Sequence, residues 1–348
     1  MQALARHTTR GFTLLEMSIA MAISLIVIAS AASLFKQGLT SSFLVTQRAQ
    51  MQQEARAAIG MMSKDISLAG SGLPTGGVQL PTNNGATASK FGCDQTAVCY
   101  ISNNSYPGNY LYGVIPNPAS GAILQTGVGA TDSITVAYND TDFRLNSYTA
   151  TLSPNGSSVT FTLPNPAPIP APQAVNDPAV GLKAGDLVLL SNNLGSAIGE
   201  VTKVQGGNQV SFDNGDPLNI NQSGATAGNI AAIAAGNNTV AYRLLVITYY
   251  IDDQPGSQPR LMRQVNGQTP VPVSEDLAGL QVSFDIFDES ANQVTSNLKD
   301  AGGFPNQIRK VNLDISTHSP LHGTSGYQSL DLATSVSVRN MSFRDRYR

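Results

Sequence analysis

The feature that most constrains this chain is an uncharged run of 19 residues from Met17 to Phe35, interrupted only by four serines. A helix of about 20 apolar residues spans the roughly 30 Å hydrocarbon core of a bilayer. Residues 1–10 precede this run with Arg6 and Arg10 and without an acid. Because positively charged flanks stay on the cytoplasmic side, we expect a single-pass chain whose residues after 36 are exported.

Three interpretations of this N-terminus compete. A signal anchor explains the basic flank and the apolar run, but not Glu16 at the head of the run. A secretory signal would be cleaved at Ala29-Ser30-Ala31, but its apolar part is usually about 7–15 residues long. The third interpretation gives Glu16 a function, because a carboxylate at membrane depth costs about 2.5–3.5 kcal/mol. No Lys or Arg lies between Glu16 and Lys36, so its partner must come from another chain or from a free amine.

The hexapeptide GFTLLE, from Gly11 to Glu16, lies behind a short basic leader and resembles the class III signal of type IV prepilins. The resemblance implies that a prepilin peptidase removes the leader, residues 1–11, by cutting between Gly11 and Phe12. It also implies that the new amino group of Phe12 is N-methylated, and that Glu16 pairs with the methylated ammonium of a neighbouring subunit. Since two buried charges cancel in one axial register only, such a pair specifies assembly more than it stabilises it.

Helical spacing of apolar residues continues beyond the membrane segment. It predicts that residues 12–35 form the transmembrane or filament-core helix and that residues 36–70 form its amphipathic continuation. Gly70, Gly72 and Pro74 supply a stop, so we expect one helix from Phe12 to Ala69. The apolar stripe consists of Met51, Ala55, Ala58, Ile59, Met62, Ile66 and Ala69, and polar residues such as Glu54, Lys64 and Asp65 take the other positions.

Residues 71–348 are expected to form a periplasmic β-rich globular region, because short alternating runs separated by turn clusters replace the helical pattern. An antiparallel sheet packed on the long helix is the natural architecture, so the predicted fold class is α+β. The resemblance to type IV prepilins implies that this α+β fold is pilin-like. The expected strands lie at 134–138, 159–163, 186–190, 242–251, 280–286, 311–315 and 332–338.

Six prolines between Pro164 and Pro178 predict an extended connector, since such a density cannot lie in a central strand. Residues 164–178 are either a boundary between two lobes of this region or a long surface loop within one domain. Residues 71–92 and 220–238 are rich in Gly, Asn and Ala and are expected to be loops, with one helical turn at 230–235.

A looser similarity extends into the β-rich region. Residues 55–70, 183–191, 249–267, 277–284 and 311–340 resemble the PilW group of minor pilins, whereas residues 75–180 resemble no family. The J-type pseudopilins of type II secretion share the same leader and a similar body. They are the alternative assignment.

Cys93 and Cys99 are the only cysteines of the chain. In an exported domain an even pair predicts a disulfide, here one that closes a local loop. Redox or zinc chemistry would require a Cys-x-x-Cys spacing or a nearby His, and the sequence has neither.

The charge balance and the motif content argue against nucleic-acid binding and catalysis. Charged residues make up 12% of the chain and the net charge is −3, whereas a nucleic-acid binder needs clustered Lys and Arg. The sequence contains no nucleophile-elbow, zinc-protease or phosphate-loop motif. His318 and His322 are interpreted as part of a solvated turn. Asp213, Asn214 and Asp216 are interpreted as a β-turn, with Ca²⁺ binding as the alternative.

These observations predict a structural subunit that is not an enzyme and has neither cofactor nor metal. The resemblance implies a minor pilin for initiation, priming or tip assembly of a type IV pilus. It also implies as partners a prepilin peptidase, other minor pilins, the major pilin, a large tip adhesin and the inner membrane. The expected location is the bacterial inner membrane, with a periplasmic body, and then the pilus.

Overall fold

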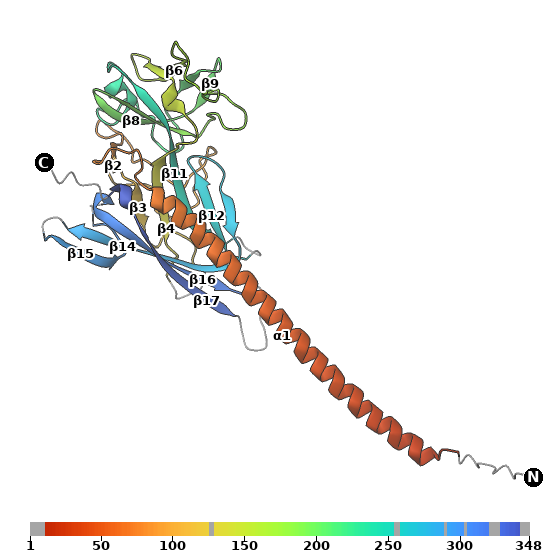
Figure 1. Ribbon diagram of the computed structural model, residues 1–348. Helices are drawn as coiled ribbons and strands as arrows, with labels where there is room; N and C mark the ends of the chain where they lie inside the picture. The colour runs from red at the N-terminus through yellow and green to blue at the C-terminus, as the bar shows by residue number, and fades with distance from the viewer. Residues whose placement is uncertain are drawn as a thin grey trace, which may run out of the picture. The chain divides into compact units, whose positions relative to one another are not determined.

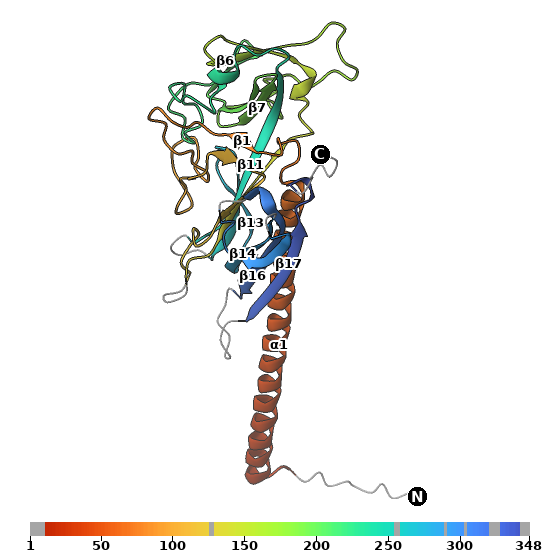
Figure 2. The ribbon, with the colours of Figure 1, turned by 90° about the vertical axis from the view of Figure 1, so that its left-hand side faces the viewer.

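The computed structural model describes residues 11–124, 129–253, 258–288, 291–302, 305–319 and 328–341. Residues 1–10 of the expected leader lie outside these ranges, as does His322. A long apolar helix is followed by antiparallel sheets, which confirms the α+β fold class (Figures 1 and 2). The chain divides into two compact units, Met1–Gln50 and Met51–Arg348.

The helix α1 runs without interruption from Leu14 to Leu68. It begins two residues later and ends one residue earlier than the sequence predicted, so the expected continuity of the apolar and amphipathic segments is confirmed. The chain leaves the helix through Gly70 (φ +80°) and Gly72 (φ +73°). This left-handed conformation costs glycine little because it has no Cβ, and it is a common way to end a helix.

Antiparallel strands dominate the second unit, and each of the seven expected strands is present. Short 3₁₀ helices lie at Leu145–Ser147 (η1), Ile230–Ile233 (η2), Pro305–Gln307 (η3) and Arg339–Met341 (η4), of which η2 was expected. The strands in the described ranges are β1 (Val78–Gln79), β2 (Tyr110–Leu111), β3 (Val114–Asn117), β4 (Ser133–Asn139), β5 (Thr149–Leu152), β6 (Ser158–Thr162), β7 (Leu187–Asn192), β8 (Gly195–Glu200), β9 (Lys203–Gln205), β10 (Gln209–Ser211), β11 (Val240–Asp252), β12 (Arg260–Val265), β13 (Val271–Ser274), β14 (Leu277–Asp288), β15 (Gln293–Leu298), β16 (Ile308–His318) and β17 (Ser329–Ser337).

The largest sheet has the strand order β13-β12-β11-β4-β3, and β7 and β8 join it along β11. The long strand β11 therefore has two sets of neighbours. Its residues 240–244 pair with β7, and its residues 244–249 pair with β4. A second sheet has the order β15-β14-β16-β17, and two smaller sheets contain β5-β6-β10-β9 and β1-β2.

The second half of α1 packs on these sheets with the apolar stripe that the sequence predicted. Ala58, Met62 and Ile66 have no exposed surface and share one core with residues of β4, β11, β14 and β16. Asp65, at one of the polar positions of this helix, is buried, with 3% of its surface exposed. Its surroundings, given below, explain why a carboxylate is stable there.

A separate apolar core lies in the segment that connects β4 to β11. Its members run from Phe143 to Ala241 and include Phe161 of β6 and Val188 of β7. The proline-rich residues 164–178 contain no helix or strand, as expected of a connector. A division into two lobes at this connector stays a prediction.

Candidate functional site

The first part of α1 exposes apolar side chains along its whole length. Phe12 is 90% exposed and Phe35 is 69% exposed. The large apolar side chains between these two residues are exposed as well. By length and composition this helix can cross a membrane. Ser18 and Ser30 donate their hydroxyls to carbonyl oxygens three and four residues earlier, at 2.9 and 2.8 Å, so these groups need no water. An apolar surface of this size needs a bilayer or neighbouring helices to cover it.

Thr13 and Glu16 form a capping box at the start of α1. The Thr13 backbone N–H and hydroxyl both donate to the Glu16 carboxylate, at 2.9 and 3.0 Å. In return the Glu16 backbone N–H donates to the Thr13 hydroxyl oxygen, at 3.2 Å. Helix starts leave backbone N–H groups without helical partners, and this reciprocal arrangement satisfies two of them. The cap was not predicted from the sequence, although Thr-x-x-Glu before an apolar run is its known signal.

The capped carboxylate keeps one oxygen available. In the described ranges both donors from Thr13 reach Oε2 of Glu16, and no Lys or Arg side chain forms an ion pair with it. Oε1 can therefore accept a hydrogen bond from a cation on another chain. Gly11 and Phe12 precede the helix and are exposed, so the peptide bond between them is outside regular structure.

A buried carboxylate links the second half of α1 to the largest sheet by hydrogen bonds. Asp65 accepts hydrogen bonds from the hydroxyls of Tyr138 (2.8 Å) and Tyr249 (2.6 Å) and from Nε of Arg263 (2.9 Å). These three donors lie on β4, β11 and β12, three adjacent strands of the largest sheet. Burial, together with the adjacent carboxylate, raises the pKa of both tyrosines above its ordinary value. The hydroxyls therefore stay protonated and remain donors to Asp65.

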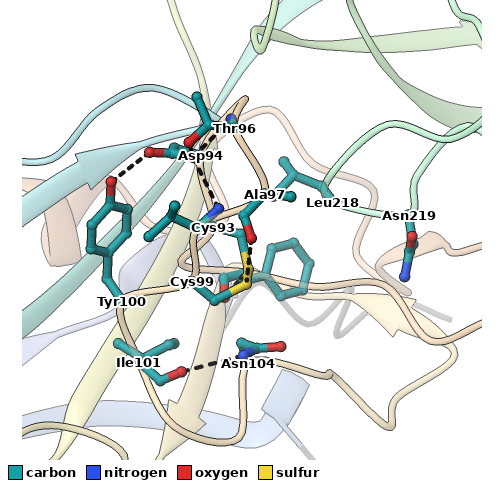
Figure 3. The surroundings of a disulfide bond; sticks show 12 residues. Cys93, Asp94, Thr96, Ala97, Cys99, Tyr100, Ile101, Asn104, Leu218 and Asn219 are labelled. Atoms are coloured by element: carbon teal, nitrogen blue, oxygen red, sulfur yellow. Dashed lines mark hydrogen bonds between the residues drawn. A yellow bond between two sulfur atoms is a disulfide. The ribbon is translucent and has the colours of Figure 1, made fainter.

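The predicted disulfide between Cys93 and Cys99 is present and closes a short loop (Figure 3). Inside this loop Asp94 accepts hydrogen bonds from the Thr96 backbone N–H (2.8 Å), the Thr96 hydroxyl (2.6 Å) and the Tyr100 hydroxyl. Burial acts to raise the pKa of Asp94, but these hydrogen bonds outweigh it and lower the pKa below its ordinary value. The loop is thus held at its ends by the disulfide and in its middle by one carboxylate.

The acidic cluster at 213–216 supports a turn. Asp216 accepts the backbone N–H groups of Ile220 (2.8 Å) and Asn221 (2.7 Å), and Asp213 accepts the Thr202 hydroxyl (3.0 Å). Within the described part of the chain, no group of three or more His, Cys, Asp or Glu residues is arranged to hold a metal.

The chain is therefore an α+β protein with one apolar helix that is capped at its start and is long enough to span a membrane. Comparison with known families adds that residues 6–32 match the prokaryotic N-terminal methylation motif, a span that contains Gly11, Phe12 and Glu16. The chain therefore carries an N-terminal methylation motif that extends into its exposed apolar helix.

Comparisons with whole proteins add little. No curated protein matches the chain. A solved type IV-like pilin from Thermus thermophilus is similar at 12% sequence identity, covering 46% of this chain and 87% of that chain, with a TM-score of 0.20. A score this low supports no inference about the β-rich region.

Proposed function

We propose that this chain is a minor pilin of the PilW type, a non-catalytic structural subunit that acts in initiation, priming or tip assembly of a type IV pilus. The observation that carries the proposal is the position of the methylation motif, which ends inside an exposed apolar helix that begins at Leu14. A secretory signal is removed together with its apolar segment. A pilin instead keeps this helix, first as membrane anchor and then as filament core.

In this proposal a prepilin peptidase cuts between Gly11 and Phe12, and the amino group of Phe12 is methylated. In the single subunit, Thr13 supplies hydrogen-bond donors to the Glu16 carboxylate. Before assembly, Glu16 therefore has donors in the membrane without a second chain. On assembly its second oxygen accepts the methylated ammonium of a neighbouring subunit. The β-rich region then lies in the periplasm and contacts other minor pilins, the major pilin and a large tip adhesin.

The first test is the mass of the N-terminal peptide of the mature protein. We expect a chain that starts at N-methylated Phe12. Gly11→Val should leave the leader in place, because the bulky side chain stands at the cleaved bond. Gly38→Ala is the matched control, since a Cβ at this exposed helical glycine meets nothing within 4 Å. A mature chain that starts near Ala32 contradicts the proposal, because the assembly helix would be lost.

The second test separates the charge of Glu16 from its capping role. Glu16→Gln keeps an oxygen for the Thr13 donors, since Gln also serves in a capping box, but it removes the negative charge. We expect Glu16→Gln and Glu16→Ala to insert in the membrane normally and to be absent from purified filaments. Normal incorporation of Glu16→Gln would show that the helix cap alone matters.

A J-type pseudopilin of a type II secretion system would have the same mature N-terminus. Deletion of the gene distinguishes the two functions. Loss of surface pili with normal export of secreted enzymes supports the pilus assignment. Loss of export with pili intact assigns the chain to secretion.

A further inference from the structure

A hollow of about 380 Å³ lies on the β-rich region, beside the paired strands β1 and β2. Its walls are residues 79–83, 86–89 and 106–110, and none of these described residues is Lys, Arg, His, Asp or Glu. The volume lies within the range of about 300–1,000 Å³ that is usual for small-molecule sites. The hollow is therefore large enough for a small ligand and carries no charge of its own.

The pairing of β1 with β2 places an aromatic ring beside a side-chain amide in this hollow. Gln79 and Tyr110 are direct partners across the two strands. Such partners carry their side chains on the same face of the sheet, with Cβ atoms about 4.5–5.5 Å apart. Since Tyr110 is 40% exposed, its ring is accessible to a ligand that also reaches the Gln79 amide.

Four polar side chains of the hollow have no hydrogen-bond partner within the described part of the chain. They are those of Gln79, Thr82, Asn83 and Asn109, and all four are at least partly exposed. A side-chain amide offers both an acceptor oxygen and N–H donors, and a hydroxyl also donates and accepts. The hollow thus presents donors and acceptors together.

Hydrogen bonds to a distant loop hold the wall that contains residues 82–89. The Thr87 backbone N–H donates to Oε1 of Gln222 (2.8 Å), and Nε2 of Gln222 donates back to the Thr87 carbonyl (2.8 Å). Nδ2 of Asn84 donates to the Gly224 carbonyl (2.7 Å). These bonds connect residues 135–140 positions apart in the sequence, so this wall is part of the tertiary structure.

The wall that contains residues 106–110 is held in a similar way. The Tyr106 hydroxyl donates to the Tyr110 carbonyl (3.0 Å), and the Tyr106 ring meets Phe91 edge to face, with ring centroids 5.7 Å apart. The Leu80 backbone N–H donates to the Asn109 carbonyl (2.9 Å). A site that is already formed loses less conformational entropy when a ligand binds.

The chemistry of the hollow selects among classes of ligand. A phosphate, sulfate or carboxylate group would call for Arg or Lys, which the described walls do not contain. An apolar ligand would displace water from the free amides without replacing its hydrogen bonds. A neutral sugar has hydroxyls that donate and accept, as side-chain amides do, and a C–H face that can pack on an aromatic ring.

We propose that this hollow binds a neutral saccharide. The Tyr110 ring packs on the C–H face of the sugar, and the amides of Gln79 and Asn109 form hydrogen bonds with its hydroxyls. The site would give an exported region a contact with uncharged glycans. It does not depend on the pilin assignment.

The test is calorimetric titration of the full-length protein in a detergent whose head group contains no sugar. The probes are maltotriose, cellotriose and triacetylchitotriose, together with the pair lactose and sialyllactose. We expect at least one neutral sugar to bind, and the same free sugar to compete with its insoluble polymer, namely starch, cellulose or chitin. Sialyllactose should bind no more tightly than lactose, because no cation lies among the described walls.

Two variants locate the binding in the hollow. Tyr110→Ala removes the ring and Gln79→Ala removes an amide, and each should weaken binding by about tenfold. Asn237→Ala is the control and should bind as the wild type does, because Asn237 is an exposed asparagine outside the hollow. Circular dichroism checks that the variants fold. If Tyr110→Ala does not fold, Gln79→Ala decides the outcome.

Three results would overturn the proposal. The first is that none of the neutral sugars binds, or that every folded hollow variant binds as tightly as the wild type. The second is binding to a polymer that the free sugar does not compete with, since a polymer surface would then be recognised. The third is tighter binding of sialyllactose than of lactose, which would show that the site prefers an acid.

Discussion

The hydrogen-bond network around Asp65 makes a strong prediction about stability. Asp65→Ala leaves the hydroxyls of Tyr138 and Tyr249 and the guanidinium of Arg263 without their shared acceptor. Removing one member of a buried ion pair costs about 3–5 kcal/mol. Because 22% of the Arg263 side chain is exposed, its guanidinium keeps contact with water. We therefore expect the free energy of unfolding to fall by about 3 kcal/mol, the lower end of this range. Asp65→Asn keeps one acceptor oxygen and should cost about 2 kcal/mol, because bonds to a charged group are the stronger ones.

The measurement is denaturant unfolding of the full chain in detergent, followed by the circular dichroism of its 11 tyrosines, since the chain has no Trp. Lys64→Ala is the matched control, because Lys64 is the exposed neighbour of Asp65 on α1 and such positions usually change stability by less than about 0.5 kcal/mol. A second readout is phenolate absorbance at high pH. Without the Asp65 charge, the pKa values of Tyr138 and Tyr249 should move toward the ordinary value of 10.0. The reasoning is refuted if Asp65→Ala and Lys64→Ala unfold at the same denaturant concentration.

Further predictions concern the disulfide and two glycines. Replacing both Cys93 and Cys99 by Ser should cost about 2 kcal/mol, the value expected for so short a closed loop, and a reductant should shift the unfolding of the wild type but not of this variant. Gly70→Ala should destabilise by about 1–2 kcal/mol, since φ is +80° and a Cβ would lie 2.8 Å from Cγ of Met341. Gly60→Ala should instead stabilise by about 0.5–1 kcal/mol, because this helical glycine is exposed and a Cβ there meets nothing within 4 Å. In one unfolding assay, the free energy of unfolding should fall for Gly70→Ala and rise for Gly60→Ala. A change in the same direction for both variants would contradict this reasoning.

Much of the fold could be predicted from local patterns. The apolar run from Met17 to Phe35 and the stripe that follows predicted one helix, and α1 ends within two residues of the expected bounds. Strands with regular alternation, such as β14 and β16, were also predicted. Strands β8 and β15 are among those that were not predicted. Apolar and polar residues do not alternate in GSAIGE or QVTSNL, and all six residues of β15 are exposed. Such strands depend on pairing with neighbours more than on their own residues.

The N-terminal site is a property of the sequence itself. The proposed cleavage bond, the cap and Glu16 lie within six residues, so the resemblance to a prepilin signal and the Thr-x-x-Glu capping pattern are both present in the local sequence. Asp65 could not be understood in that way, because its tyrosine donors are 73 and 184 residues distant along the chain. The same holds for Glu200, which is 1% exposed and whose carboxyl group accepts hydrogen bonds from Gln95 and Leu218 of separate loops. Local periodicity therefore determined the helix and its head, whereas tertiary folding decided which carboxylates are buried, since burial depends on what distant segments bring to them.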